Sequence, residues 1–274
     1  MKIAVAGKGG VGKTLIAGGI AYSLARAGHT TIAIDADPTP NLARTLGIPA
    51  EKAGSILTIA ENADLIRGKT GTEFPGVYSL NFTVDDIVAR YSFLTPSGVN
   101  LLVMGTVKSM DAGCSCAANS VLRALLRHLI VERDEAVILD MEAGLEHIGR
   151  GTAAGVDCMA LVSDANAKSL DTAGRIARMA RDFKMGGIVL IGNRVRNDSD
   201  TRVITDFAAG HDISIAGFVP YDPAVTENGI RGDSILDLTD SPALDAIGRI
   251  GRSIMKICVA GREDKENQKM RNDA

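Results

Sequence analysis

Two short stretches of the sequence carry residues whose types and spacing could do chemistry. The first is GKGGVGKT, residues 7–14, in which glycines alternate with two lysines and a threonine. Glycines let backbone N–H groups wrap around phosphate oxygens, and lysines match the phosphate charge. The second is Cys114-Ser115-Cys116, a close pair of thiols in a chain with four cysteines. The first stretch indicates phosphate binding, and the second indicates a thiolate metal site.

The glycine-rich stretch matches two known phosphate-binding patterns. Its glycines fit the dinucleotide pattern G-x-G-x-x-G, with Asp35 placed where such folds carry a ribose-binding acid. They also fit G-x-x-x-x-G-K-[ST], in which Lys13 contacts the β- and γ-phosphates and the hydroxyl of Thr14 holds Mg²⁺. A strand before the stretch and a helix after it satisfy the second pattern. A nucleoside triphosphate is therefore the favoured ligand, and a chance match is the alternative.

The elements that must position these residues alternate along the chain. β-Branched runs predict strands, whereas apolar residues at helical spacing predict helices between most of them. The strands are expected at residues 2–6, 30–34, 99–104, 135–140, 158–162, 187–191 and 213–219, and the main helices at 13–27, 117–132, 168–183 and 201–210. This alternation predicts an α/β fold, with one mostly parallel twisted sheet and helices on both faces.

Composition limits the partners and the compartment. The net charge of −3 and the 4% of aromatic residues argue against nonspecific DNA binding and against attraction to an anionic membrane. The apolar run at the N-terminus is too short for a signal peptide, so we expect a cytoplasmic protein in a reducing compartment. We expect one ATPase domain over residues 1–260 and a disordered, charged tail over 261–274. The last helix of the domain, before this tail, is expected to pack on the sheet, with a membrane-surface helix as the alternative.

Lys8 carries a resemblance to a known family. A second lysine early in the loop, as in KGGVGKT, resembles the deviant Walker A motif of the MinD/ParA P-loop ATPases. The resemblance implies that Lys8 reaches the partner's nucleotide in an ATP-dependent homodimer and that Asp37 positions the attacking water. It further implies that Asp35 supports the Mg²⁺ shell, and that Asp140 begins the D-x-x-x-G switch II motif. The alternative interpretation of Asp35 and Asp37 is as N-caps of the segment that follows.

The same resemblance supplies the residues that hold the nucleotide. It implies that Asn193 reads adenine and that the loop with Pro220, Tyr221 and Asp222 closes around the base. The backbone around the phosphates would come from Gly9, Gly10, Val11, Gly12, Lys13, Thr14 and Leu15. Leu15 departs from the family, because many relatives have a second threonine there, and we expect a modest loss of affinity.

The cysteine pair narrows the resemblance. Two thiolates leave a four-coordinate ion half satisfied, and Cys114 and Cys116 of a second chain would complete an S₄ site for Ni²⁺ or Zn²⁺. Together with the segment EHIGRGTA, the pair resembles the CooC-type ATPases that mature nickel enzymes, which implies carbon monoxide dehydrogenase or acetyl-CoA synthase as the client. The alternatives are a MinD/ParA-like positioning ATPase and an ATP-driven iron–sulfur electron donor. His147 is expected to be structural, with metal ligation or nucleotide sensing as its alternatives, while Cys158 and Cys258 are expected to be buried apolar residues.

Overall fold

The computed structural model describes residues 1–37, 39–72, 79, 81–105, 112–132, 135–142, 153 and 155–272, without the side chains of 112–116, 132 and 259–272. The strands are β1 (Lys2–Gly7), β2 (Thr31–Asp35), β3 (Phe93–Leu94), β4 (Asn100–Val103), β5 (Ala136–Asp140), β6 (Cys158–Ser163), β7 (Gly187–Val195) and β8 (Ser214–Pro220). The helices are α1 (Lys13–Arg26), α2 (Leu42–Thr45), α3 (Ala50–Gly54), α4 (Ala63–Thr70), α5 (Asp85–Tyr91), α6 (Ala112–Arg127), α8 (Ala167–Asp182), α9 (Asp198–Gly210), α10 (Pro223–Arg231) and α11 (Pro242–Asn272). Two short turns complete the fold, the π-helical η1 (His128–Glu132) and the 3₁₀-helical η2 (Ile235–Asp237).

The sheet places the glycine-rich loop at its centre. In the described residues the strand order is β3-β4-β2-β5-β1-β6-β7-β8, so β1 lies between β5 and β6. All neighbouring pairs are parallel except β3 with β4. Because parallel strands end at the same edge, the loops after β1, β2 and β5 meet there. Open α/β sheets bind ligands at this edge.

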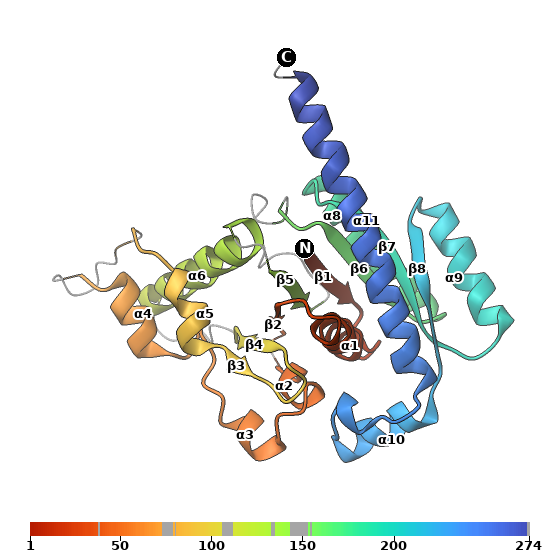
Figure 1. Cartoon of the computed structure of the whole chain (residues 1–274), viewed down its shortest axis with the longest axis horizontal. Coiled ribbons are helices and arrows are strands. Elements are labelled where there is room, and N and C mark those ends of the chain that lie inside the picture. Colours follow the sequence, from red (N-terminus) through yellow and green to blue (C-terminus); the bar gives the residue numbers. More distant parts are fainter. Residues whose placement is uncertain are drawn as a thin grey trace.

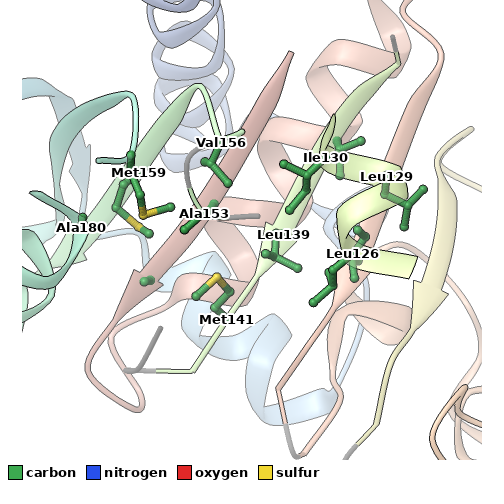
Figure 2. Close-up of a cluster of buried hydrophobic side chains, with 14 of the residues drawn as sticks. Leu126, Leu129, Ile130, Leu139, Met141, Ala153, Val156, Met159 and Ala180 are labelled. Atoms are coloured by element: carbon green, nitrogen blue, oxygen red, sulfur yellow. The ribbon is translucent and has the colours of Figure 1, made fainter. Parts of the chain in front are cut away.

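Alternating side chains of the strands form a core on each face of the sheet. In β1, Ile3 and Val5 belong to the cluster that packs against α1, α2 and α11, whereas Ala4 and Ala6 belong to the cluster under α6, α8 and α9. Figure 1 shows α1 and α11 on one side of the sheet. On the other side, Leu126, from α6, and Leu129 lie beside Leu139 of β5 (Figure 2). The fold class predicted from the sequence is confirmed.

Most of the expected elements are present, and three differences concern their ends. β7 extends to Val195 instead of ending near residue 191, because its pairing with β8 continues past a bulge. α6 begins at Ala112, five positions before the expected start at residue 117. α11 continues as a helix to Asn272, where a disordered tail was expected. Its last part is rich in Glu, Lys, Gln and Arg, which are strong helix formers as well as charged residues.

The final helix projects away from the rest of the chain (Figure 1). Its first half packs on the sheet, where Ile247, Ile250 and Ile254 are buried. No helix among the described residues is long and apolar enough to cross a membrane.

Candidate functional site: a nucleotide-binding loop with two buried acids

The glycine-rich loop joins β1 directly to α1. Gly12 precedes the helix with φ +97°, a left-handed conformation that L-residues rarely adopt, and a Cβ there would lie 2.4 Å from Nδ2 of Asn193. Gly7 ends β1 so close to β6 that a Cβ would lie 2.3 Å from the carbonyl oxygen of Val162. The free N–H groups of the first turn of α1 therefore face the loop, which is a suitable arrangement for phosphate.

The two lysines of the loop lie in different surroundings. Lys13 is buried, and its Nζ lies 3.5 Å from the carbonyl oxygen of Lys8, so its charge stays over the loop. The side chain of Lys8 is exposed and lines a separate cavity beside α8. Lys13 is thus placed to contact phosphates bound within the same chain, while Lys8 faces outward.

Asp35 and Asp140 end neighbouring strands as register partners of β2 and β5. Both side chains are buried. Asp35 accepts hydrogen bonds from the backbone N–H of Leu42 (2.9 Å) and Asp37 (3.2 Å). Burial nevertheless raises the pKa of Asp35 to about 6, because these bonds only partly offset the loss of hydration.

The buried carboxylate of Asp140 differs from that of Asp35 in its hydrogen bonding. Among the described residues, neither of its carboxylate oxygens has a hydrogen-bond partner of normal geometry. Burial, with a smaller contribution from the nearby Asp35, raises its pKa to about 7, although Thr14 and Lys13 act in the opposite direction. A buried, unpartnered carboxylate is costly unless a cation or a donor satisfies it. With the Thr14 hydroxyl and Asp35 nearby, this oxygen-rich corner fits Mg²⁺.

Asp37 lies next to this corner on the exposed side. Its carboxylate is half-buried and accepts hydrogen bonds from the backbone N–H and the hydroxyl of Thr39, each at 2.9 Å. The turn that these bonds stabilise fixes the position of Asp37. The second oxygen of Asp37 has no partner among the described residues, so it can accept a further hydrogen bond.

A cavity of about 590 Å³ adjoins the loop and suits a nucleoside. Its lining includes Gly12, Leu15, Asn193, Pro220, Tyr221 and Asp222, which brings together the residues expected around the base. Nδ2 of Asn193 donates a 2.7 Å hydrogen bond to the carbonyl oxygen of Val11. Asn193 therefore holds the glycine-rich loop, a role that the sequence pattern did not indicate.

Several residues of this cavity were missed by the sequence analysis. Arg196 lies over the ring of Tyr221, 4.7 Å from its centroid. Arg194 has a φ of +55° and also lines the cavity. The sequence NRVR, directly at the end of a strand, was the available signal for both arginines. The contribution of α10, through Val225 to Ile230, depends on the tertiary fold and had no local signal.

Part of the expected site lies outside what the structure describes. Positions 114 and 116 belong to the first turns of α6, but the side chains of Cys114 and Cys116 are not among those described. His147 lies outside the described residues. Cys158 and Cys258 are both buried, and their contact with each other, together with burial, raises the pKa of Cys158. Their predicted role as buried small residues is confirmed.

The sequence has close relatives among known proteins. A family model described as the CobQ/CobB/MinD/ParA nucleotide binding domain matches residues 2–235. The carbon monoxide dehydrogenase accessory protein CooC of Rhodospirillum rubrum is 42% identical over 89% of this chain and 91% of that protein. An uncharacterized ATP-binding protein of Methanocaldococcus jannaschii is 40% identical over 94% of this chain and 98% of that protein.

Solved structures share the fold at lower identity. A chain of the MinC:MinD cell division complex of Aquifex aeolicus has a TM-score of 0.67 and 20% identity, covering 93% of this chain and 96% of that chain. The cell division ATPase MinD of Pyrococcus furiosus has a TM-score of 0.66 and 18% identity, covering 94% and 100%. The chain therefore belongs to the CobQ/CobB/MinD/ParA nucleotide-binding family, as a CooC-type member.

Proposed function

We propose that this protein is an ATP-dependent accessory factor that carries nickel, or zinc, to a nickel enzyme such as carbon monoxide dehydrogenase or acetyl-CoA synthase. The observation that carries the ATPase part is Asp140 at the end of β5, which is buried near Lys13 and Thr14 and has no hydrogen-bond partner in the part of the chain that the structure describes. The similarity to CooC supports the accessory role.

In this proposal hydrolysis relies on positioning and charge. Lys13 and the backbone N–H groups of the loop bind the phosphates, and Lys8 contacts the nucleotide of a second copy. Asp37, fixed by Thr39, orients the attacking water through its second carboxylate oxygen. Mg²⁺ held by Thr14 with the acids nearby would neutralise charge on the transferred phosphoryl group. Each copy then contributes to the other's site, so ATP favours the closed dimer.

The metal cargo is assigned to Cys114 and Cys116 from both copies. Four thiolates suit tetrahedral Zn²⁺ or square-planar Ni²⁺. Positions two apart in a regular helix lie on different faces, so the first turns of α6 must leave helical geometry for one chain to chelate through both. Metal binding and dimer closure would favour the same state and thus reinforce each other.

An anaerobic titration with Ni²⁺ and Zn²⁺ tests the cargo. We expect one tightly bound ion per two chains, lost in Cys114→Ala/Cys116→Ala. The matched control is Cys158→Ala/Cys258→Ala, which removes as many thiols from a buried pair and should keep the ion. Binding that survives in the first variant would reject the Cys-x-Cys site.

ATP hydrolysis tests the nucleotide site separately. Lys13→Ala and Asp37→Ala should each lower turnover at least a hundredfold, because they remove phosphate binding and water orientation. Normal turnover in either variant would reject the role given to that residue.

A positioning ATPase is the second candidate, favoured by one feature. α11 projects from the body (Figure 1) and carries exposed Arg252, Lys256 and Ile257, which could contact a surface. ATP-dependent sedimentation with anionic vesicles, lost on deletion of residues 259–274, would favour this candidate. Absence of sedimentation would reject the positioning ATPase and favour the metal carrier. The absorbance of anaerobically purified protein would reveal an iron–sulfur electron donor.

A further inference from the structure

A basic groove runs along α8, outside the nucleotide cavity. It has a volume of about 600 Å³ and is lined by Lys8, Lys168, Asp171, Thr172, Gly174, Arg175, Arg178 and His211. Four of these residues are cations and one is an acid, whereas the whole chain has a net charge of −3. The groove is therefore a local concentration of positive charge on an acidic protein.

The basic groove follows from the helical spacing of α8. Lys168, Asp171, Arg175 and Arg178 are separated by three, four and three positions, so they share one face of the helix, and all four side chains are exposed. Gly174 lies behind them, and a Cβ there would lie 3.2 Å from Nε2 of His211. This close approach of α9's end forms the wall of the groove.

The cations of the basic groove are available for a ligand. None of the four forms an ion pair with a carboxylate in the part of the chain that the structure describes. To the described residues, Arg175 donates a single 3.2 Å side-chain hydrogen bond, to the hydroxyl of Thr172. Two arginines one turn apart present planar donor pairs that match carboxylates in a bidentate fashion.

The shape and lining of the basic groove argue for a peptide. The distance along α8 from Lys168 to Arg178 is about 15 Å, which four or five extended residues would span. None of the large apolar residues that are exposed lies in the lining, so the groove offers no anchor for a bilayer. The lining also has no aromatic ring besides His211 on which bases could stack.

We propose that the basic groove of α8 docks an acidic segment of a partner protein. The inference rests on the proposed function in one respect, because the client enzyme would be that partner. Lys8 is part of the lining, so the docking surface adjoins the face that a second copy would cover. A client bound there would sense whether the ATP-dependent dimer is open or closed.

Fluorescence anisotropy with a labelled hexaglutamate peptide tests the proposal, with hexaglutamine as the neutral probe. Arg175→Glu/Arg178→Glu should weaken hexaglutamate binding at least tenfold. The matched control, Arg249→Glu/Arg252→Glu, reverses two exposed arginines at the same spacing on α11 and should change it less than twofold. Asp171→Asn should tighten binding two- to fivefold, because it removes the acid of the groove. This gain cannot result from unfolding.

Some outcomes would overturn the proposal. Equal binding by the wild type and Arg175→Glu/Arg178→Glu, or equal affinity for hexaglutamine, would exclude the basic groove as an acidic-peptide site. Displacement of the peptide by equimolar inorganic phosphate would assign it to a small anion instead. Tighter, Arg175-dependent binding of duplex DNA or of phosphatidylglycerol vesicles would assign it to those partners.

A failure of the proposed function would give different results from a failure of the docking proposal. ATP hydrolysis and metal stoichiometry should be unchanged in Arg175→Glu/Arg178→Glu, so a loss confined to peptide binding concerns docking alone. If the wild type binds no metal through Cys114 and Cys116 but binds hexaglutamate through α8, the cargo assignment is wrong and the docking site stands.

Discussion

Two acids at strand ends, Asp35 and Asp140, are buried at a cost to the fold. Asp35 and Asp140 are register partners, both buried, and the charge of Asp35 helps to raise the pKa of Asp140. Asp35 recovers part of the cost through two backbone N–H donors, whereas Asp140 has no such donor among the described residues. The corner is built for a cation, and without one it favours the neutral form of Asp140.

This imbalance predicts how stability depends on pH. The pKa of Asp140 is about 7 in the folded protein against an ordinary value of 3.8, so between these values the folded state binds the extra proton. Stability without nucleotide and Mg²⁺ should therefore fall as pH rises from about 4 to about 7. Asp140→Asn should remove much of the fall and, at pH 8, stabilise the protein by on the order of 2 kcal/mol. Urea unfolding at pH 5 and pH 8 measures this.

The control for that experiment is Asp206→Asn on α9, an exposed position where the wild-type pH dependence should persist. A steeper loss of stability with pH in Asp140→Asn than in the wild type would contradict the assignment. Addition of MgADP at pH 8 should make the wild type more stable than Asp140→Asn, because only the carboxylate of the wild type binds the cation strongly.

Asn193 gives a second prediction at the residue scale. Its Nδ2 donates to the carbonyl oxygen of Val11, so Asn193→Asp would set a carboxylate oxygen against that carbonyl. If Asn193 mainly holds the loop, ATP and GTP affinities should fall together, by at least tenfold. If it mainly reads adenine, the variant should lose ATP affinity alone and change the preference between the two nucleotides. Isothermal titration with both nucleotides distinguishes the two roles.

At the scale of elements, the turn between β1 and α1 depends on one backbone conformation. Gly12→Ala forces a Cβ into a left-handed residue and against Asn193, and should destabilise the protein by about 2 kcal/mol and abolish ATP binding. Gly9→Ala is the matched control, since a Cβ there meets nothing within 4 Å. Thermal unfolding should leave Gly9→Ala close to the wild type; equal losses in both variants would refute this account.

Local sequence patterns predict the position of each helix and strand better than they predict which elements lie next to one another. Lys13, Thr14 and Asp140 were placed correctly at strand and helix ends, because β-branched runs and the loop motif are short-range signals. The register pairing of Asp35 with Asp140 could not be predicted, because strand order depends on contacts more than 100 residues apart. The bond from Asn193 to Val11 is non-local for the same reason. The end of β7 was missed because Gly192 and Asn193 are poor strand formers, and pairing with β8 overrides that preference.

At the scale of the whole molecule, the exposed Lys8 predicts an ATP-dependent change in mass. In an Asp37→Ala background, which slows turnover, MgATP should shift the protein from its chain mass of 28.7 kDa to twice that value by light scattering. Lys8→Ala should abolish the shift. Lys168→Ala removes another exposed lysine from the same basic groove and should keep it. A dimer that forms without Lys8 would show that this residue does not bridge the copies.

The central position of β1 has a consequence for synthesis on the ribosome. Among the described residues β1 pairs with β5 and β6, which follow it on the ribosome and end at Asp140 and Ser163. At roughly 5–20 residues per second, synthesis from the end of β1 to the end of β6 takes about 8 to 30 s. During that time its apolar sequence KIAVAG has no partner strand in the sheet. Nascent chains that stop before residue 163 should therefore remain bound to chaperones. ATP binding can stabilise only the chains that extend beyond this residue.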